Sequence, residues 1–268
     1  MPELPEVEVI TRELRSMFKG KRIKEVLVYT ERVIRGVSKD EFIKELTGKR
    51  VREVIRKGKA ILFNVEDLWL IIHLKINGQI YISESKPPWS MIKFRFEGEK
   101  RCLYLCDFRG LVEIRLSKDP YKETFLAKMG PDALSEEFTF EYFYSKIKDS
   151  RSKIKSLIMD QGFIAGIGNI YAAESLFRAK IRPDRIAKSL SEEEVKKLYV
   201  AIKDVLQDSI CYGAAVKKYF VDGKDRGDFS DKFLVYNREG QPCRICGEKI
   251  VKITLSGRGT YFCPVCQV

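Results

Sequence analysis

The sequence has a single histidine, few Asn and Gln residues, and no long apolar run. One histidine, His73, cannot build a histidine-based metal site. No stretch resembles a signal peptide, a transmembrane segment or a low-complexity tail, so we expect a soluble, cytoplasmic protein. Few amide side chains beside abundant Lys and Glu are typical of thermophiles. This composition predicts a melting temperature above the mesophile range.

Positive charge is what the chain has in excess. Lys and Arg number 50 against 38 acids, which gives a net charge of +12 and a pI near 9.3. The excess favours a polyanionic partner, with plain solubility as the alternative. The 268 residues are enough for two domains with their own cores.

Seven cysteines are an odd number, and four of them are clustered near residue 268. Two pairs, Cys243 with Cys246 and Cys263 with Cys266, bracket sixteen residues. This spacing predicts a four-cysteine site for one structural Zn²⁺ in a reducing compartment. Four thiolates leave no open coordination position, so we expect the metal to fold the tail rather than to catalyse.

The first residues form a candidate catalytic group. Removal of Met1 would leave Pro2 as a secondary amine, with Glu3 beside it and Glu6 one helical turn away. Such an amine can attack a sugar C1′ or an aldehyde and form an iminium that drives elimination. The alternative is a plain helix start, because proline and acids are both favoured there.

Apolar spacing predicts a helix over residues 3–19, then many short strands that indicate an antiparallel sandwich or barrel. A capping box at Ser38 and Glu41 predicts one helix among the strands. The expected strands are 22–29, 50–56, 60–65, 69–74, 79–82, 91–97, 102–106 and 111–116.

From about residue 135 the period becomes helical. The expected helices are 139–148, 153–160, 170–179 and 191–210, the last with a capping box at Ser191 and Glu194. Asn169 caps a glycine-lined helix start, which can expose backbone N–H groups to a phosphate. Residues 213–231 are predicted to be a long mobile loop of the kind that covers a site.

Single residues raise further questions. Lys59 lies between two strands, where a solvated loop charge is the usual alternative to a functional role. His73 lies in a strand, where a structural role is the usual alternative. Cys102 and Cys106 are expected to fill the core. Arg258 is predicted at the tip of a hairpin, where it either reaches a phosphate or is solvated.

Three motifs together resemble the formamidopyrimidine-DNA glycosylase and endonuclease VIII family. They are the N-terminal segment 2–8 (PELPEVE), the segment 166–177 (GIGNIYAAESLF) and the two terminal cysteine pairs. The resemblance runs over essentially the whole chain in order. It implies an α+β multidomain fold, with an N-terminal β-sandwich and leading helix, then a helix-two-turn-helix domain with a zinc finger. The boundaries we expect are 1–134 for the catalytic sandwich, 135–231 for the helical domain with its lesion-capping loop, and 232–268 for the zinc finger.

The resemblance also implies a bifunctional enzyme of base-excision repair, a DNA glycosylase and AP lyase. Pro2 would attack C1′, form a Schiff base and support β- then δ-elimination, with Glu3 as the acid on the deoxyribose and Glu6 in support. Lys59 and Arg258 would assist in catalysis. The implied partner is damaged double-stranded DNA, bound by a monomer associated with the nucleoid. The DNA would lie in a cleft between the domains, contacted by His73, Ile76, Arg109, Leu111, Arg151, Lys155, Asn169, Tyr171 and Arg258.

Some positions depart from the family pattern. Members fill the gap left by the extruded base with a methionine, an arginine and a phenylalanine, where this chain has Ile76, Arg109 and Leu111, the last after Gly110. The aromatic wedge is therefore missing at this position, which leaves the opposite-base preference open. Ala215 and Val216 replace threonines in the loop linked to 8-oxoguanine capture, so the preferred lesion is open as well.

Three functions follow as hypotheses. The first is removal of oxidised purines, chiefly 8-oxoguanine and formamidopyrimidines. The second applies the same mechanism to oxidised pyrimidines, as in endonuclease VIII. The third is a zinc-containing DNA-binding protein without catalysis, against which Pro2, Glu3 and Lys59 argue because a pure binder does not need them.

Overall fold

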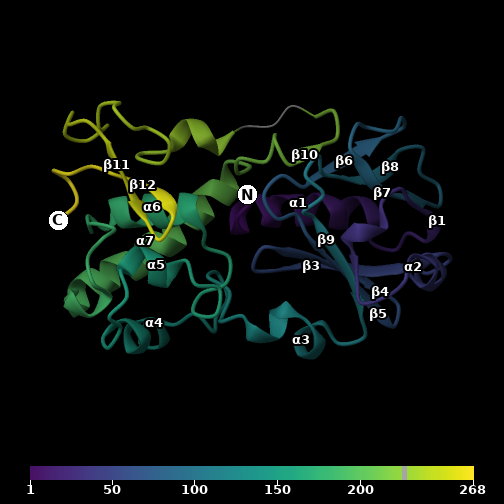
Figure 1. Cartoon of the computed structure of the whole chain (residues 1–268), viewed down its shortest axis with the longest axis horizontal. Helices are drawn as coiled ribbons and strands as arrows, with labels where there is room; N and C mark the ends of the chain where they lie inside the picture. The colour runs from purple at the N-terminus through teal and green to yellow at the C-terminus, as the bar shows by residue number, and fades with distance from the viewer. Residues whose placement is uncertain (225–227) are drawn as a thin grey trace. The chain divides into compact units, whose positions relative to one another are not determined.

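The computed structural model describes residues 1–224 and 228–268, and the chain divides into two compact units. Unit 1 comprises Met1–Ala127 and Gly213–Asp228, and unit 2 comprises Lys128–Tyr212 and Phe229–Val268 (Figure 1). The sequence grouped 213–231 with the helices. In the structure the segment Gly213–Asp228 packs with unit 1, because Val216, Tyr219 and Phe220 enter the core of that unit.

Unit 1 is a sandwich of two five-stranded sheets, as predicted. One sheet has the order β2-β9-β5-β4-β3 and the other β1-β7-β8-β6-β10. Apolar residues of both sheets, among them Phe63, Ile72, Phe94 and Leu105, form one core. The first sheet comprises β2 (Ile34–Arg35), β9 (Glu113–Ser117), β5 (Leu68–His73), β4 (Ala60–Val65) and β3 (Val51–Lys57). The second comprises β1 (Ile23–Val28), β7 (Ser90–Phe96), β8 (Cys102–Cys106), β6 (Gln79–Ser83) and β10 (Phe220–Val221).

Helix α1 (Leu4–Phe18) is the leading helix and lies one residue inside its predicted ends. Its apolar stripe is buried and includes Val7, Ile10 and Leu14. Phe18 stacks on Phe96 with ring centroids 4.1 Å apart, which fixes the helix on the sandwich. Two short helices also belong to unit 1, α2 (Lys39–Leu46) and α3 (Pro120–Glu123).

The predicted loop 213–231 is partly regular, and that part of the prediction was wrong. Phe220 and Val221 form β10, which pairs in parallel with β6. Apolar and aromatic side chains drive this pairing, because they bury area on the sandwich core. Residues 225–227 of the predicted loop lie outside the described residues.

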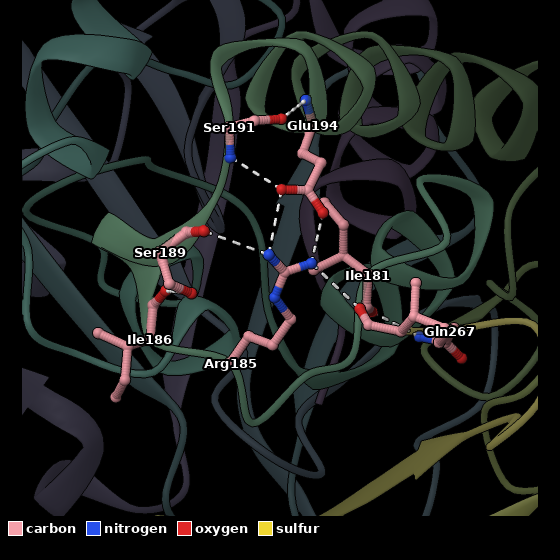
Figure 2. Close-up of polar contacts among 8 residues, drawn as sticks. Ile181, Arg185, Ile186, Ser189, Ser191, Glu194 and Gln267 are labelled. Atoms are coloured by element: carbon pink, nitrogen blue, oxygen red, sulfur yellow. Dashed lines mark hydrogen bonds and ion pairs between the residues drawn. The ribbon is translucent and has the colours of Figure 1, made fainter.

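Unit 2 contains α4 (Phe140–Ile147), α5 (Ile154–Ile158), α6 (Asn169–Arg178), α7 (Glu192–Cys211) and the hairpin of β11 (Val251–Leu255) and β12 (Arg258–Phe262). An aromatic cluster of Phe138, Phe143 and Tyr199 joins α4 to α7. The Ser191 and Glu194 capping box is present, and Arg185 donates to both oxygens of the same Glu194 carboxylate (Figure 2). The start of α7 is thereby tied to the α6–α7 connection.

No helix among residues 1–224 and 228–268 combines the length and the apolarity needed to cross a membrane.

Candidate functional site

The start of α1 places two carboxylates beside the N-terminus. Glu3 is 2 % exposed and Glu6 is fully buried. One oxygen of Glu6 accepts the Glu3 backbone N–H at 2.8 Å, and the other accepts the Ala215 N–H at 3.3 Å. Glu6 therefore joins the helix start to the segment Gly213–Asp228, and both acids are held in fixed positions within unit 1.

The N-terminal amine of the chain also lies at the start of α1. The Met1 ammonium donates to the Tyr219 hydroxyl at 3.1 Å. Burial lowers the pKa of this amine below its usual value, and Lys218 and Lys59 lower it further, while the charges of Glu3 and Glu6 oppose the shift. An amine in this setting is a free base more often at neutral pH, as a nucleophile requires. Pro2, one residue along, is itself buried.

The sequence did not single out Tyr219 or Lys218. Both lie in the segment that was treated as a mobile loop, so its pairing with β6 was needed to bring them to the N-terminus. The lysine pair 217–218 followed by an aromatic residue was the only local signal.

Lys59 lies in the two-residue turn between β3 and β4, where Gly58 has a positive φ of 54°. The side chain is only 6 % exposed, so the alternative of a solvated loop charge is wrong. An ion pair between Arg56 and Glu8, 2.8 Å apart, ties the strand before the turn to α1. Burial alone would raise the pKa of Glu8, but Arg56 and Arg12 hold that pKa below its usual value, so this pair is charged at neutral pH.

His73 ends β5 and is a neutral group. Its Nδ1 accepts the Lys75 backbone N–H at 3.0 Å, so the imidazole proton is on Nε2. Burial, together with the charges of Lys75 and Lys59, lowers the pKa of His73 to about 4. At physiological pH the ring can donate one hydrogen bond to a phosphate but cannot pair with it as a cation.

Three of the predicted DNA contacts lie on exposed loops of unit 1. Ile76 is 46 % exposed and Leu111 45 % exposed, and Arg109 is exposed between β8 and β9. Cys102 and Cys106 on the preceding strand are buried, as expected of core residues.

In unit 2 a buried lysine joins the predicted phosphate-binding residues to the hairpin. Lys155 is 2 % exposed, and its ammonium donates to Asn169 Oδ1 at 2.6 Å and to Thr260 Oγ1 at 2.7 Å. Asn169 Nδ2 in turn donates to the Gly259 carbonyl at 3.0 Å. The start of α6 and the β11–β12 hairpin therefore form one hydrogen-bonded cluster. The ammonium of Lys155 lies inside this cluster, so its effect on a ligand is indirect.

Two further predicted contacts in unit 2 have different surroundings. Arg151 is exposed at the turn before α5. Tyr171 is fully buried, and its hydroxyl hydrogen-bonds Ser209 on α7 at 2.7 Å. A direct DNA contact by Tyr171 is therefore corrected to a core role, because the apolar face of α6 carries the ring into the helix pair.

The hairpin presents Arg258 to solvent. Ser256 and Gly257 form the turn with positive φ values of 49° and 71°, so the tip lies just before Arg258, which is the first residue of β12. Ser256 Oγ lies 3.0 Å from Ser156 Oγ on α5, which fixes the tip on that helix.

The four terminal cysteines form a metal site. Their sulfur atoms all lie within 4.8 Å of one another. The distances from Cys243 to Cys266, 3.9 Å, and from Cys246 to Cys263, 3.5 Å, agree with the edge of about 3.8 Å that follows from a tetrahedral Zn–S length of ~2.3 Å. Backbone N–H groups of Ile245 and Cys266 point at ligand sulfurs, as they do around thiolates. The residues fit one structural zinc.

Glu174 on α6 attaches this finger to the helices. Its buried carboxylate accepts the backbone N–H groups of Leu234, Val235 and Tyr236 at 2.8–3.0 Å. The far end of the finger is also held, because Gln267 donates to the Ile181 carbonyl (Figure 2). The sequence offered Glu174 only as part of the segment 166–177.

Comparison with known proteins gives the same picture along the whole chain. Residues 1–114 match the formamidopyrimidine-DNA glycosylase N-terminal domain, and 129–220 match the formamidopyrimidine-DNA glycosylase H2TH domain. Residues 240–268 match the zinc finger found in FPG and IleRS. The formamidopyrimidine-DNA glycosylase of Listeria monocytogenes is 36% identical, with all of both chains covered.

Solved structures agree. A mutant FPG of Lactococcus lactis in complex with Fapy-dG-containing DNA is similar with a TM-score of 0.93 and 33% identity, covering 99% of each chain. The wild-type Lactococcus lactis FPG with oxidised-pyrimidine-containing DNA gives a TM-score of 0.91 at 33% identity and the same coverage. With two glycosylase domain models, a zinc finger and full-length relatives matched in order, the chain belongs to the formamidopyrimidine-DNA glycosylase family.

Proposed function

We propose that this protein is a base-excision-repair DNA glycosylase with AP lyase activity that removes oxidised purines such as 8-oxoguanine and formamidopyrimidines from duplex DNA. Family membership supports the reaction class. The observation that carries the assignment is the geometry of the N-terminal site, where Pro2, Glu3, Glu6 and Lys59 are all buried within unit 1 and the charges of Glu3, Glu6 and Lys59 act on the N-terminus. We assign catalysis to residues 1–134, DNA binding and lesion capping to residues 135–231, and the zinc finger to residues 232–268. The capping part of the second range, Gly213–Asp228, packs with unit 1.

The chemistry begins when Met1 is removed and the Pro2 nitrogen becomes a secondary amine. This nitrogen attacks C1′ of the damaged nucleotide, the bond from C1′ to the base breaks, and the base leaves with a proton. Glu3 protonates the deoxyribose ring oxygen, so that the ring opens and a cationic iminium forms between Pro2 and C1′. The iminium withdraws electrons from the neighbouring carbons, and loss of a proton from C2′ expels the 3′-phosphate in the β-elimination. The δ-elimination then releases the 5′-phosphate. Glu6 holds the site in place, and Lys59 contacts phosphate and transfers protons.

Residues of unit 2 bind the phosphates of the DNA backbone. Arg258 and Arg151 are exposed cations that pair with phosphates, and Asn169 lies at the start of α6, where backbone N–H groups favour an anion. The effect of Lys155 on DNA binding is indirect, because its hydrogen bonds hold Asn169 and the hairpin together. In unit 1, the Nε2–H group of His73 donates a hydrogen bond to a phosphate of the DNA backbone.

Oxidised pyrimidines are the second candidate substrate. A relative at 33% identity binds DNA containing an oxidised pyrimidine, and another structure of that relative holds Fapy-dG. By the family resemblance, Ala215 and Val216 occupy positions where members often have threonines, so these two positions supply no hydroxyl group to a purine. Comparing excision from 8-oxoguanine:C and thymine-glycol:A duplexes separates the two, and faster excision of thymine glycol would overturn our first assignment.

The test of the mechanism is borohydride trapping on a duplex with an abasic site, using the mature protein and Pro2→Gly. We expect a covalent adduct that mass spectrometry locates on Pro2. Pro2→Gly retains a terminal primary amine, so its adduct should form more slowly while DNA binding is unchanged. Tight DNA binding without any adduct, from protein with a verified Pro2 N-terminus, would instead identify a DNA-binding protein without catalysis. Because the substrate is chromosomal lesions, we place the protein with the nucleoid in the cytoplasm.

A further inference from the structure

The two loops that join the sheets of unit 1 expose large apolar side chains. Phe108 is 56 % exposed, more than either Ile76 or Leu111. Exposing an aromatic ring of this size is unfavourable unless a partner covers it.

Topology puts these residues at one end of the sandwich. His73 pairs with Glu113 in one sheet, and Gln79 pairs with Cys106 in the other. The connection 74–78 therefore leaves β5 and enters β6 where the connection 107–112 leaves β8 and enters β9. The two loops run side by side between the sheets, one with Ile76 and the other with Phe108 and Leu111.

The second loop is held rigid from inside. The carboxylate of Asp107, 1 % exposed, accepts the backbone N–H groups of Arg109 at 2.9 Å, Leu111 at 2.6 Å and Val112 at 2.9 Å. Gly110 adopts a positive φ of 63°. Phe108 is therefore presented on a fixed backbone, and little ordering is needed when a partner binds.

Two guanidinium groups lie at this loop, one of them beside the Phe108 ring. The Arg109 guanidinium carbon lies 5.5 Å from the centroid of the Phe108 ring. At Gly110 a Cβ would lie 2.0 Å from Nη2 of Arg32, so the glycine leaves room for a second guanidinium. An exposed aromatic ring on a loop with guanidinium groups suits a nucleobase beside its phosphates better than an apolar protein surface.

We infer that Phe108 is the side chain that stacks on the base opposite the lesion, a role for which the sequence offered only the aliphatic Leu111. The inference rests on the proposed function, because only an enzyme that extrudes a base leaves an unpaired base on the opposite strand. Leu111 and Ile76 contribute apolar contact to the same gap, and Arg109 hydrogen-bonds the unpaired base.

The experiment uses a duplex with a tetrahydrofuran abasic analogue and 5-iodouracil on the opposite strand. Irradiation of the complex joins 5-iodouracil to a stacked aromatic residue, which mass spectrometry identifies. We expect the cross-link on Phe108. Phe108→Ala should abolish it and weaken binding roughly tenfold. Leu111→Ala should keep it.

Trp89 is the matched control, because it is 65 % exposed and its carbonyl accepts the Asp107 N–H at 3.1 Å. Trp89→Ala should leave the cross-link in place, whereas a cross-link on Trp89, or full affinity of Phe108→Ala, would overturn the inference. Borohydride trapping of the same proteins on a second duplex, with a true abasic site in place of the tetrahydrofuran analogue, keeps the two claims apart. Wild type and Phe108→Ala both form the Pro2 adduct if the enzyme function is right, wherever the cross-link lies.

Discussion

His73 shows how the surroundings of one residue set its charge. Its pKa is lowered to about 4, while an unfolded histidine titrates near 6.5. Between these values the unfolded chain binds more protons than the folded chain, so stability is complete above pH 6.5 and is lost as the pH falls towards 4.

For this reason we expect wild type to lose about 2 kcal/mol of stability between pH 7.5 and pH 4.5 from His73 alone. His73→Gln should lack this component, and the pH dependence of its unfolding free energy should be flatter by that amount. Urea unfolding at the two pH values measures the difference. Equal pH dependence in both proteins would show that His73 titrates normally in the fold.

For single residues, the sequence predicts the chemical role of a side chain better than it predicts how deeply that side chain is buried. Pro2, Glu3 and Glu6 were predicted as the N-terminal site from residue type and order alone, and their catalytic roles stay predictions. Lys59 and Lys155 were found as well, but their burial depends on side chains far along the chain, and no local pattern reveals it. Tyr171 was assigned to DNA because its motif was matched as a unit, although Ala172, Leu176 and Phe177 beside it already marked an apolar helix.

At the scale of elements, Lys155 holds the β11–β12 hairpin on the start of α6. Lys155→Met removes the donor and leaves the oxygens of Asn169 and Thr260 without this partner inside the protein. We expect a loss of about 2–4 kcal/mol in unfolding free energy and weaker DNA binding, because Arg258 is no longer held in place. Chemical unfolding and a binding titration measure the two effects.

Arg258→Ala is the control for that variant. It removes an exposed cation, so unfolding should be unchanged within about 0.5 kcal/mol. The slope of log affinity against log salt should fall by about 0.9 for one lost phosphate contact. If Lys155→Met unfolds like wild type, the cluster does not hold the hairpin.

Elements with their own periodicity were predicted nearly to the residue. The helix expected at 191–210 is Glu192–Cys211, and the strand expected at 60–65 is Ala60–Val65. The two-residue strands β2 and β10 were missed, since each is defined by parallel pairing with a distant strand rather than by its own sequence.

At the scale of the molecule, the zinc site is the clearest target for removal. The finger has a small core of its own, with Ile250 and two cysteines packed on α6 residues. Stripping the metal with a chelator should unfold the finger and abolish specific DNA binding, while the sandwich of unit 1 stays folded. Metal analysis should find one zinc per chain beforehand, and readdition of Zn²⁺ should restore binding. Full DNA affinity in the stripped protein would contradict this.

Thermal stability is a second property of the whole chain. We expect a melting temperature well above ~65 °C, the upper end of the mesophile range. The composition supports it, and the surface carries ion pairs that share partners, such as Glu53 with Arg15 and Lys19. Differential scanning calorimetry on the zinc-loaded protein gives the value, and melting near 50 °C would refute the expectation.

The route of the chain through unit 2 has a consequence for its synthesis. Lys155 and Thr260 are 105 residues apart, and Glu174 meets Val235 across 61 residues. On the ribosome the helices emerge well before the finger that completes their surface. Unit 2 can therefore finish folding, and take up its zinc, only after the residues of the finger have emerged. A nascent chain that stalls before the second cysteine pair would carry the amine and the acids of α1, yet would lack the hairpin arginine with which to hold a strand. Given the proposed roles of these residues, we expect such an incomplete chain to bind DNA weakly and therefore to cut it poorly.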